Sequence, residues 1–216
     1  MTVVGLTGGV AAGKSTVSVL WASLGAIIFD ADVFAREAVA LGTPGLAAIA
    51  QEFGPTVLLD SGELDRKALG ERIFADPAAR AALNGIVHPY VRALSAAALD
   101  RAGNDHPRTV LVYDVPLLAE SRDPGEFDLV VVVDAPAATR VSRLQEFRGL
   151  TREQAENRVS SQASDADRLA LADVVLDASG SLEDTTIAAR ELYEALTVAW
   201  PDKLQTVPTR FPSSAS

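Results

Sequence analysis

One glycine-rich stretch restricts the possible folds of this chain more than any other feature. Residues 8–15 read Gly-Gly-Val-Ala-Ala-Gly-Lys-Ser and match the pattern G-x-x-x-x-G-K-[ST]. An apolar run at residues 3–7 precedes them, and a helical pattern over residues 14–24 follows. Glycines let the backbone curl so that successive N–H groups point at an anion, and the positive end of the following helix strengthens that field. The pattern predicts a strand, a phosphate-binding loop and a helix, and with them a bound nucleoside triphosphate.

The side chains of the loop indicate how the nucleotide is bound. Lys14 can reach the β- and γ-phosphates, where we expect it to be catalytic, and the Ser15 hydroxyl can ligate Mg²⁺. The residues expected to bind the nucleotide are Ala11, Ala12, Gly13, Lys14, Ser15 and Thr16. The chain contains no Asn-Lys-x-Asp string of the kind with which GTPases read guanine. ATP and Mg²⁺ are therefore the expected cofactors.

Short apolar runs alternate with longer helical patterns along the chain. Runs that are apolar throughout are typical of strands covered on both faces, and the alternation predicts an α/β fold with a parallel sheet. The expected strands are 3–7, 26–29, 110–113, 129–133 and, more weakly, 174–176. The expected helices are 14–24, 33–40, 66–74, 77–99, 137–147, 152–162 and 182–196. Residues 33–107 are too long for one crossover, so we expect a helical subdomain inserted between the second and third strands.

Composition excludes several kinds of partner and site. The formal net charge of −10 argues against binding to nucleic acid or to an anionic membrane. The absence of cysteine excludes disulfides, thiolate metal sites and thiol nucleophiles, which fits a reducing compartment. No apolar run approaches the ~20 residues that span a bilayer, and no basic segment precedes the first run. We expect a cytoplasmic protein, either a monomer or a weak homo-oligomer.

Aspartates stand at the ends of the predicted strands, where open α/β sheets bind their ligands. Asp32 follows the second strand and could accept the proton of an attacking hydroxyl, or could instead cap the helix that begins at Val33. For Asp30, two residues earlier, a structural role is favoured. Asp114 ends the third strand and could hold Mg²⁺ and contact substrate, or could cap a turn. At Asp134, which ends the fourth strand, capping is favoured.

Arginines crowd the segment after the fourth strand. They are Arg140, Arg143, Arg148, Arg152 and Arg158. A phosphoryl-transfer enzyme needs cations over the transferred group and needs water excluded, and a closing helix pair with arginines supplies both. The alternative is a solvated helix face with ion pairs to neighbouring glutamates. We expect at least one of these arginines to be catalytic.

The inserted subdomain and the C-terminus each contain one further feature. His88 precedes Pro89, which predicts a helix break there and a structural histidine, while Arg92 could bind phosphate groups of an acceptor. Residues 201–216 lose periodicity and predict a disordered tail.

Together these residues resemble the dephospho-CoA kinase family over nearly the whole chain. The segments that match are Gly5–Gly9 before the loop, Asp30-Ala31-Asp32 with Arg36, His88-Pro89 with Arg92, Asp114-Val115-Pro116-Leu117-Leu118, Arg143 with Arg158 and Gln162, and Ala172–Asp177 with Ser179-Gly180. The resemblance implies ATP-dependent phosphorylation of the ribose 3′-hydroxyl of dephospho-CoA, the last step of coenzyme A synthesis. It also implies a P-loop NTPase three-layer sandwich with a core (about 1–32, 108–136 and 165–200), a helical substrate insert (33–107) and a lid (137–164).

The resemblance also implies roles for single residues. Asp32 corresponds to the general base, Arg143 to the lid arginine, and His88 and Arg92 to acceptor-side residues, with Asp114 also near the substrate. This sequence departs from the family pattern at Ala11 and Ala12, at Phe147, where many members have a second lid arginine that Arg148 could replace, and at Ala178, where many have asparagine. Two alternatives remain: a nucleoside-monophosphate-type kinase, and a P-loop switch or assembly ATPase that acts on partners.

Overall fold

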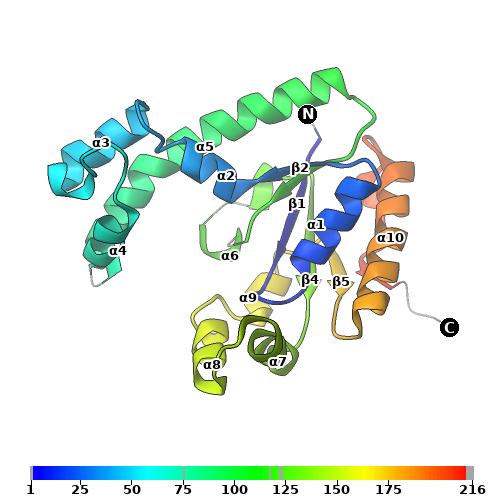
Figure 1. The fold of residues 1–216 in the computed structure, drawn as a ribbon. Helices are drawn as coiled ribbons and strands as arrows, with labels where there is room; N and C mark the ends of the chain where they lie inside the picture. Colours follow the sequence, from blue (N-terminus) through cyan, green and yellow to red (C-terminus); the bar gives the residue numbers. More distant parts are fainter. Residues whose placement is uncertain (1, 75, 117, 122–123, 213–216) are drawn as a thin grey trace. The chain divides into compact units, whose positions relative to one another are not determined.

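A six-stranded sheet forms the centre of the computed structural model, which describes residues 2–74, 76–116, 118–121 and 124–212 (Figure 1). The strands lie in the order β2-β3-β1-β4-β5-β6. Their bounds are β1 Val4–Gly8, β2 Ile27–Asp30, β3 Leu111–Asp114, β4 Leu129–Asp134, β5 Val174–Asp177 and β6 Arg210–Phe211. The pairs β1–β3, β1–β4, β4–β5 and β5–β6 are parallel. The predicted α/β class with a parallel sheet is confirmed.

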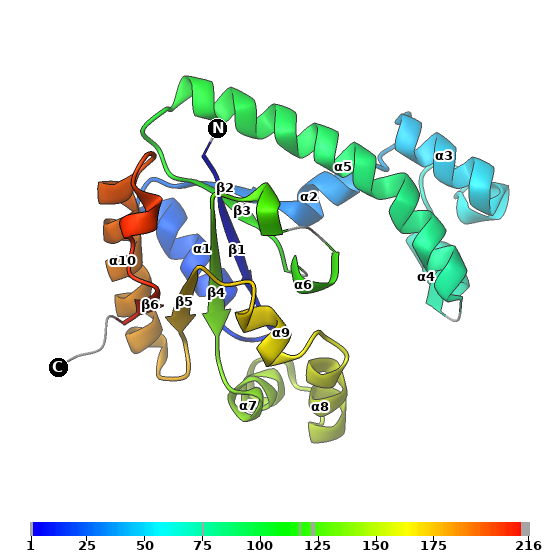
Figure 2. The same ribbon diagram turned by 180° about the vertical axis from the view of Figure 1, so that it is seen from behind.

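The central strands are apolar because both faces of the sheet are covered. All residues of β1 are buried, as are the first five of β4. Helices α1 (Lys14–Ser23) and α10 (Leu182–Ala199) lie on one side of the sheet, and α9 (Asp165–Leu169) lies on the other (Figures 1 and 2). The indole of Trp21 on α1 donates to the carbonyl of Ala189 on α10 at 2.7 Å, which joins the two helices where their apolar faces meet.

The chain forms two compact units, one of Met1–Phe29 with Arg101–Ser216 and the other of Asp30–Asp100. The second unit is helical, and its elements are α2 (Ala31–Glu37), α3 (Pro44–Phe53), the 3₁₀ turn Pro55–Val57, α4 (Arg66–Phe74) and most of α5 (Pro77–Asp105). Arg72 on α4 donates to the carbonyl of Phe53 at 2.5 Å and stacks on its ring, which ties α4 to the end of α3. The helix α3 was not predicted, although Thr43 caps it and Pro44 begins it.

The predicted helix break at Pro89 is wrong. The helix α5 runs without interruption through this proline. A proline inside a helix removes one hydrogen bond, here to the carbonyl of Gly85, while the turns on either side keep theirs. His88 and Arg92 therefore lie one turn apart on a continuous helix.

The predicted disordered tail is also wrong for residues 201–212. The 3₁₀ turn Leu204–Thr206 and the strand β6 follow α10, and β6 extends the sheet beside β5. Leu204, Val207 and Phe211 are buried in the core of the sheet. Residues 213–216 lie outside the described residues.

Two further helices follow β4, namely α7 (Ala137–Arg148) and α8 (Arg152–Ser160). Gly149 ends α7 in the left-handed conformation, and Thr151 begins α8 with a capping box to Gln154. Short helices α6 (Leu118–Ser121) and the 3₁₀ turn Pro124–Glu126 connect β3 to β4. Among the described residues, no helix combines the length and the apolar character that crossing a bilayer requires.

Candidate functional site

The phosphate-binding loop connects the central strand β1 to α1, as the sequence predicts. Gly13 has φ of 113° and Ala11 has φ of 59°, both in the left-handed region, and the Ala12 N–H donates to the carbonyl of Gly9 at 3.0 Å. Gly13 is the N-cap of α1 and has no side chain to cap it. The first N–H groups of a helix have no acceptor within the helix. The Thr16 N–H donates to the Gly13 carbonyl at 2.9 Å, whereas the N–H groups of Lys14 and Ser15 have no backbone acceptor among the described residues and are open to an anion.

Asp114 and Lys14 form an ion pair at the carboxyl edge of the sheet. The Lys14 ammonium contacts Oδ1 of Asp114, and the Ser18 hydroxyl donates to Oδ2 at 2.7 Å. Asp114 is only 8% exposed, which leaves its carboxylate poorly solvated. Both of its oxygens are instead bonded to side chains of α1. The sequence predicted Asp114 at this site, and the structure brings it to Lys14 from the neighbouring strand.

Arg143 on α7 lies against the loop and the segment that follows β5. Its guanidinium donates to the carbonyls of Ala12 at 3.0 Å, Ala178 at 2.8 Å and Gly180 at 3.1 Å. With a longer bond to the carbonyl of Ala11 at 3.4 Å, four acceptors from two segments hold the guanidinium beside the N-terminus of α1. Arg143 therefore joins the loop to the turn after β5. This turn contains Ala178, the position at which the sequence differs from the family pattern, and Arg143 contacts its backbone carbonyl.

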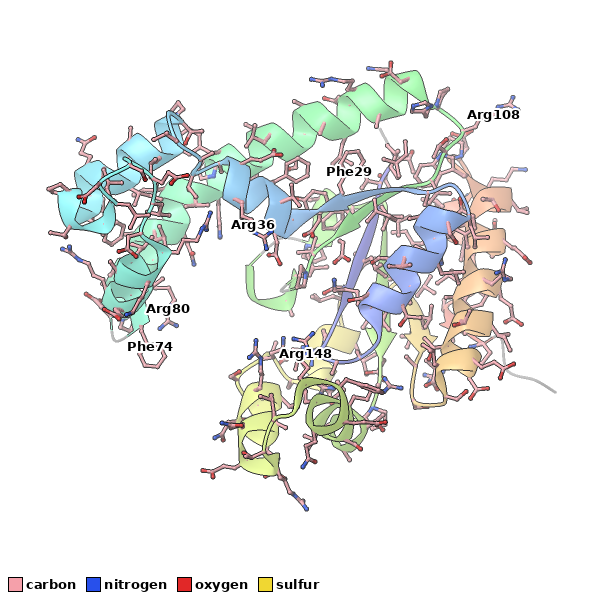
Figure 3. All side chains as sticks on the ribbon, viewed as in Figure 1. Phe29, Arg36, Phe74, Arg80, Arg108 and Arg148 are labelled. Carbon is pink, nitrogen blue, oxygen red and sulfur yellow. The ribbon has the colours of Figure 1, made fainter. Side chains whose placement is uncertain are left out.

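The other arginines of this segment differ in exposure: three lie at the surface and one is buried. Arg152 is exposed and pairs with Glu156 at 2.7 Å, which is the ion-paired solvated face that the sequence left open. Arg158 is also exposed. Arg148 is exposed on the last turn of α7 (Figure 3), next to Phe147, which is 74% exposed. Arg140 is 2% exposed and points inward.

Asp32 lies in the first turn of α2, in the helical unit. Asp30 is the N-cap of this helix, and its carboxylate accepts the Asp32 N–H at 2.8 Å. The capping role considered for Asp32 therefore belongs to Asp30. Asp32 is exposed, and its carboxylate has no hydrogen-bond partner among the described residues. Arg36 follows one turn later on the same helix (Figure 3).

The residues expected on the acceptor side lie in the same helical unit as Asp32. His88 is half-buried and Arg92 is exposed, and a spacing of four residues places them on one face of α5. Both have interactions with other residues of the structure. Leu117, in the matching segment after Asp114, lies outside the described residues.

Asp134 is not a helix cap, contrary to the prediction. The N-cap of α7 is Pro136, and Asp134 uses its backbone carbonyl to accept the Ala178 N–H at 2.7 Å. Burial raises the pKa of its carboxyl, and the neighbouring charges of Asp165 and Asp177 raise it further against the opposing effect of Arg140. The carboxyl edge of the sheet is thus crowded with aspartates.

The sequence did not predict some of the side chains that contact the loop or lie behind it. Gln162, which only the resemblance singled out, accepts the Val10 N–H at 2.8 Å and so holds the tip of the loop. Asp165 and Arg168 lie on a helix that was not predicted. The Asp165 carboxylate accepts hydrogen bonds from both Arg140 and Arg168. The spacing of three between Asp165 and Arg168 was the one available signal.

The donor set near the loop fits Mg²⁺ bound mainly through phosphate. Ser15 is exposed in the first turn of α1, and the Asp114 carboxylate lies beside Lys14. Among the described residues, no group of three or more histidines, aspartates and glutamates could hold a metal by itself. Mg²⁺ keeps several waters and commonly takes one or two protein oxygens together with substrate phosphates, so this sparse set is sufficient.

Comparison with known proteins assigns the family. A sequence model of the family described as dephospho-CoA kinase matches residues 2–184. The chain belongs to the dephospho-CoA kinase family. The dephospho-CoA kinase of Leifsonia xyli is 52% identical over 91% of this chain and 99% of its own length. That of Frankia casuarinae is 48% identical over 91% of this chain and 84% of its own.

A solved member of the family has the same fold. The dephospho-CoA kinase from Campylobacter jejuni is 25% identical to this chain, with a TM-score of 0.71 over 91% of this chain and 98% of its own. Membership in the dephospho-CoA kinase family agrees with the loop geometry and with the acidic edge of the sheet.

Proposed function

We propose that this protein transfers the γ-phosphoryl group of ATP to the 3′-hydroxyl of the ribose of dephospho-CoA, which gives coenzyme A and ADP. The observation that supports this most strongly is the loop–α1–Asp114 arrangement in a chain of the dephospho-CoA kinase family. The loop has the open N–H groups and the lysine that the phosphates of ATP need.

Each proposed role follows from one chemical need of the transfer. The acceptor oxygen attacks the γ-phosphorus, its proton passes to the Asp32 carboxylate, and the bond from phosphorus to the leaving ADP oxygen breaks. The carboxylate of Asp32 is exposed and has no partner within the described part of the chain, so it is available for that proton. Lys14 stabilises the charge that develops on the phosphate oxygens, and the loop backbone from Ala11 to Thr16 binds the nucleotide.

Ser15 would hold Mg²⁺ together with the phosphates of ATP, and the ion would supply neutralisation of their negative charge. Asp114 orients Lys14 and lies within the substrate region. Arg143 holds the nucleotide side of the site from the α7–α8 segment, which we propose to be the lid. His88 and Arg92 bind the acceptor, for which a guanidinium suits phosphate groups.

The remaining proposals concern the surroundings of the enzyme. We propose a cytoplasmic protein that acts as a monomer or weak homo-oligomer without nucleic acid or membrane partners. The net charge of −10 supports the exclusion of polyanionic partners.

The deciding experiment is ADP release with ATP and Mg²⁺ in the presence of dephospho-CoA, of AMP, or of no acceptor. We expect a large acceptor-dependent rate with dephospho-CoA alone. A rate that depends on AMP would indicate a nucleoside-monophosphate-type kinase. Equal slow rates in all three would contradict a kinase and favour a switch or assembly ATPase.

A further inference from the structure

Arg140 is a charged residue inside the protein, directly behind the phosphate-binding loop. Its side chain is 3% exposed, although arginine is rarely buried without partners. Nε donates to the carbonyl of Ala135 at 3.0 Å, and Nη2 donates to Asp165 Oδ1 at 2.5 Å. These two bonds fix the plane of the guanidinium between the start of α7 and α9.

Arg140 belongs to a cluster of charged side chains behind the loop. Arg168, which is also buried, donates to the same Asp165 oxygen at 2.8 Å. Two guanidinium groups therefore share the carboxylate of Asp165, which is 40% exposed, and the carboxyl of Asp134 lies close enough to Arg140 for their charges to interact. The guanidinium of Arg140 itself is buried. Burying such a charge costs free energy, and buried ionic groups are weak stabilisers of a fold. Stability alone does not account for this arrangement.

The third nitrogen of the guanidinium faces the loop. Nη1 of Arg140 is buried and has no hydrogen-bond partner among the described residues. A Cβ placed on Gly9 would lie 2.6 Å from this nitrogen, so the guanidinium packs directly against the backbone of Gly9. Only glycine fits at position 9 while Arg140 keeps its bonds. The same loop is held at its next residue, where the N–H of Val10 donates to Gln162.

We infer that Arg140 is a positioning residue for nucleotide binding, which sets the backbone of Gly9 and places a buried guanidinium behind the loop that receives the phosphates. This inference rests on the proposed binding of ATP by the loop. In a poorly solvated place a fixed charge acts on a phosphate with little screening. The residues that carry the effect are Arg140, its anchor Asp165 and its contact Gly9.

The first test is the affinity of purified variants for ADP with Mg²⁺, measured by calorimetry well below the unfolding temperature. We expect Arg140→Met to weaken ADP binding about tenfold or more, which corresponds to loss of one charge-assisted interaction. Arg140→Lys keeps the charge and loses the planar fork, and we expect an intermediate affinity.

The KM for dephospho-CoA should stay within about twofold, because the effect belongs to the nucleotide side. Arg152→Met is the matched control, since Arg152 is exposed on α8, and we expect wild-type affinity.

The second test is a double-mutant cycle between Gly9→Ala and Arg140→Ala. Gly9→Ala should weaken ADP binding strongly in the wild type and much less when Arg140 is shortened, because the added methyl then has room. Equal penalties in both backgrounds would overturn the contact. If Arg140→Met does not fold, Asp165→Asn and Arg140→Lys provide the same comparison.

The outcomes separate this inference from the proposed function. A folded Arg140→Met variant that binds ADP within twofold of the wild type overturns the inference and leaves the kinase proposal standing. A wild type that fails to bind ADP overturns both. A wild type that binds ADP but does not phosphorylate dephospho-CoA overturns only the proposed acceptor.

Discussion

The ammonium of Lys14 and the carboxylate of Asp114 form an ion pair that joins the first turn of α1 to the end of β3. Their side chains are 17% and 11% exposed, so neither group exchanges its partner freely for water. The Ser18 hydroxyl completes the arrangement on the second carboxylate oxygen. The lysine of the loop is therefore held in place by the strand β3.

Lys14→Met should lower kcat by about 10² to 10³, because it removes a cation from the transferred group. It should also lower the free energy of unfolding by about 3 kcal/mol, since Asp114 then lacks its partner in a poorly solvated place. The double variant Lys14→Met with Asp114→Asn should recover most of the stability and none of the activity. Steady-state kinetics and urea unfolding measure the two quantities, and an active double variant would contradict the role of Lys14.

Asp32→Asn should reduce phosphorylation of dephospho-CoA by about 10² or more while ADP affinity stays unchanged, because the amide cannot accept the proton. Asp30→Asn is the matched control. Asparagine caps helices as well as aspartate, so this variant should retain both its fold and its activity. Coupled ADP release measures both variants, and undiminished transfer by Asp32→Asn would exclude it as the base.

Phe211→Ala should destabilise the fold by about 3 kcal/mol, because it opens a cavity in the core of the sheet. Gln205→Ala, on the exposed side of the same segment, should change the free energy of unfolding by less than about 0.5 kcal/mol. Urea unfolding distinguishes the two. Equal stabilities would mean that β6 does not contribute to the core in solution.

The parts of the site that the sequence predicts are those encoded by local pattern. The loop has a motif within eight residues, and Asp114 ends an apolar run, so topology alone brings it to the loop. The sequence also singled out Asp32 as either a base or a helix cap, but only the structure shows that the capping bond belongs to Asp30.

The features that the sequence did not predict depend on contacts distant in the chain. The burial of Arg140 depends on Asp165 and on Gly9, which lie 25 and 131 residues away in the chain. From the sequence alone, its charge favoured an exposed position on a solvated helix face. The strand β6 has two residues, too few for a periodic pattern, and gains its place by pairing with β5. By contrast, the start of α3 was encoded locally in Thr43 and Pro44 and was overlooked.

The pKa of Asp134 gives a pH dependence whose sign follows from proton linkage. Burial raises this pKa in the folded protein, with further contributions from Asp165 and Asp177, so the folded state holds the proton at a pH where the unfolded chain has lost it. The free energy of unfolding therefore falls as pH rises from about 3.8 through the folded pKa, and the loss persists above it. Below both values the carboxyl is protonated in both states and has no effect.

Asp134→Asn should remove this penalty, because the amide does not ionise. We expect the variant to gain stability relative to the wild type as pH rises through the acidic range toward 7, and the difference to shrink toward its low-pH value as pH falls. Urea unfolding at a series of pH values measures it. Asp202→Asn, at an exposed position after α10, is the control and should follow the wild type at every pH. A difference for Asp134→Asn that stays constant with pH would contradict the raised pKa and would attribute the change to the amide's own contacts.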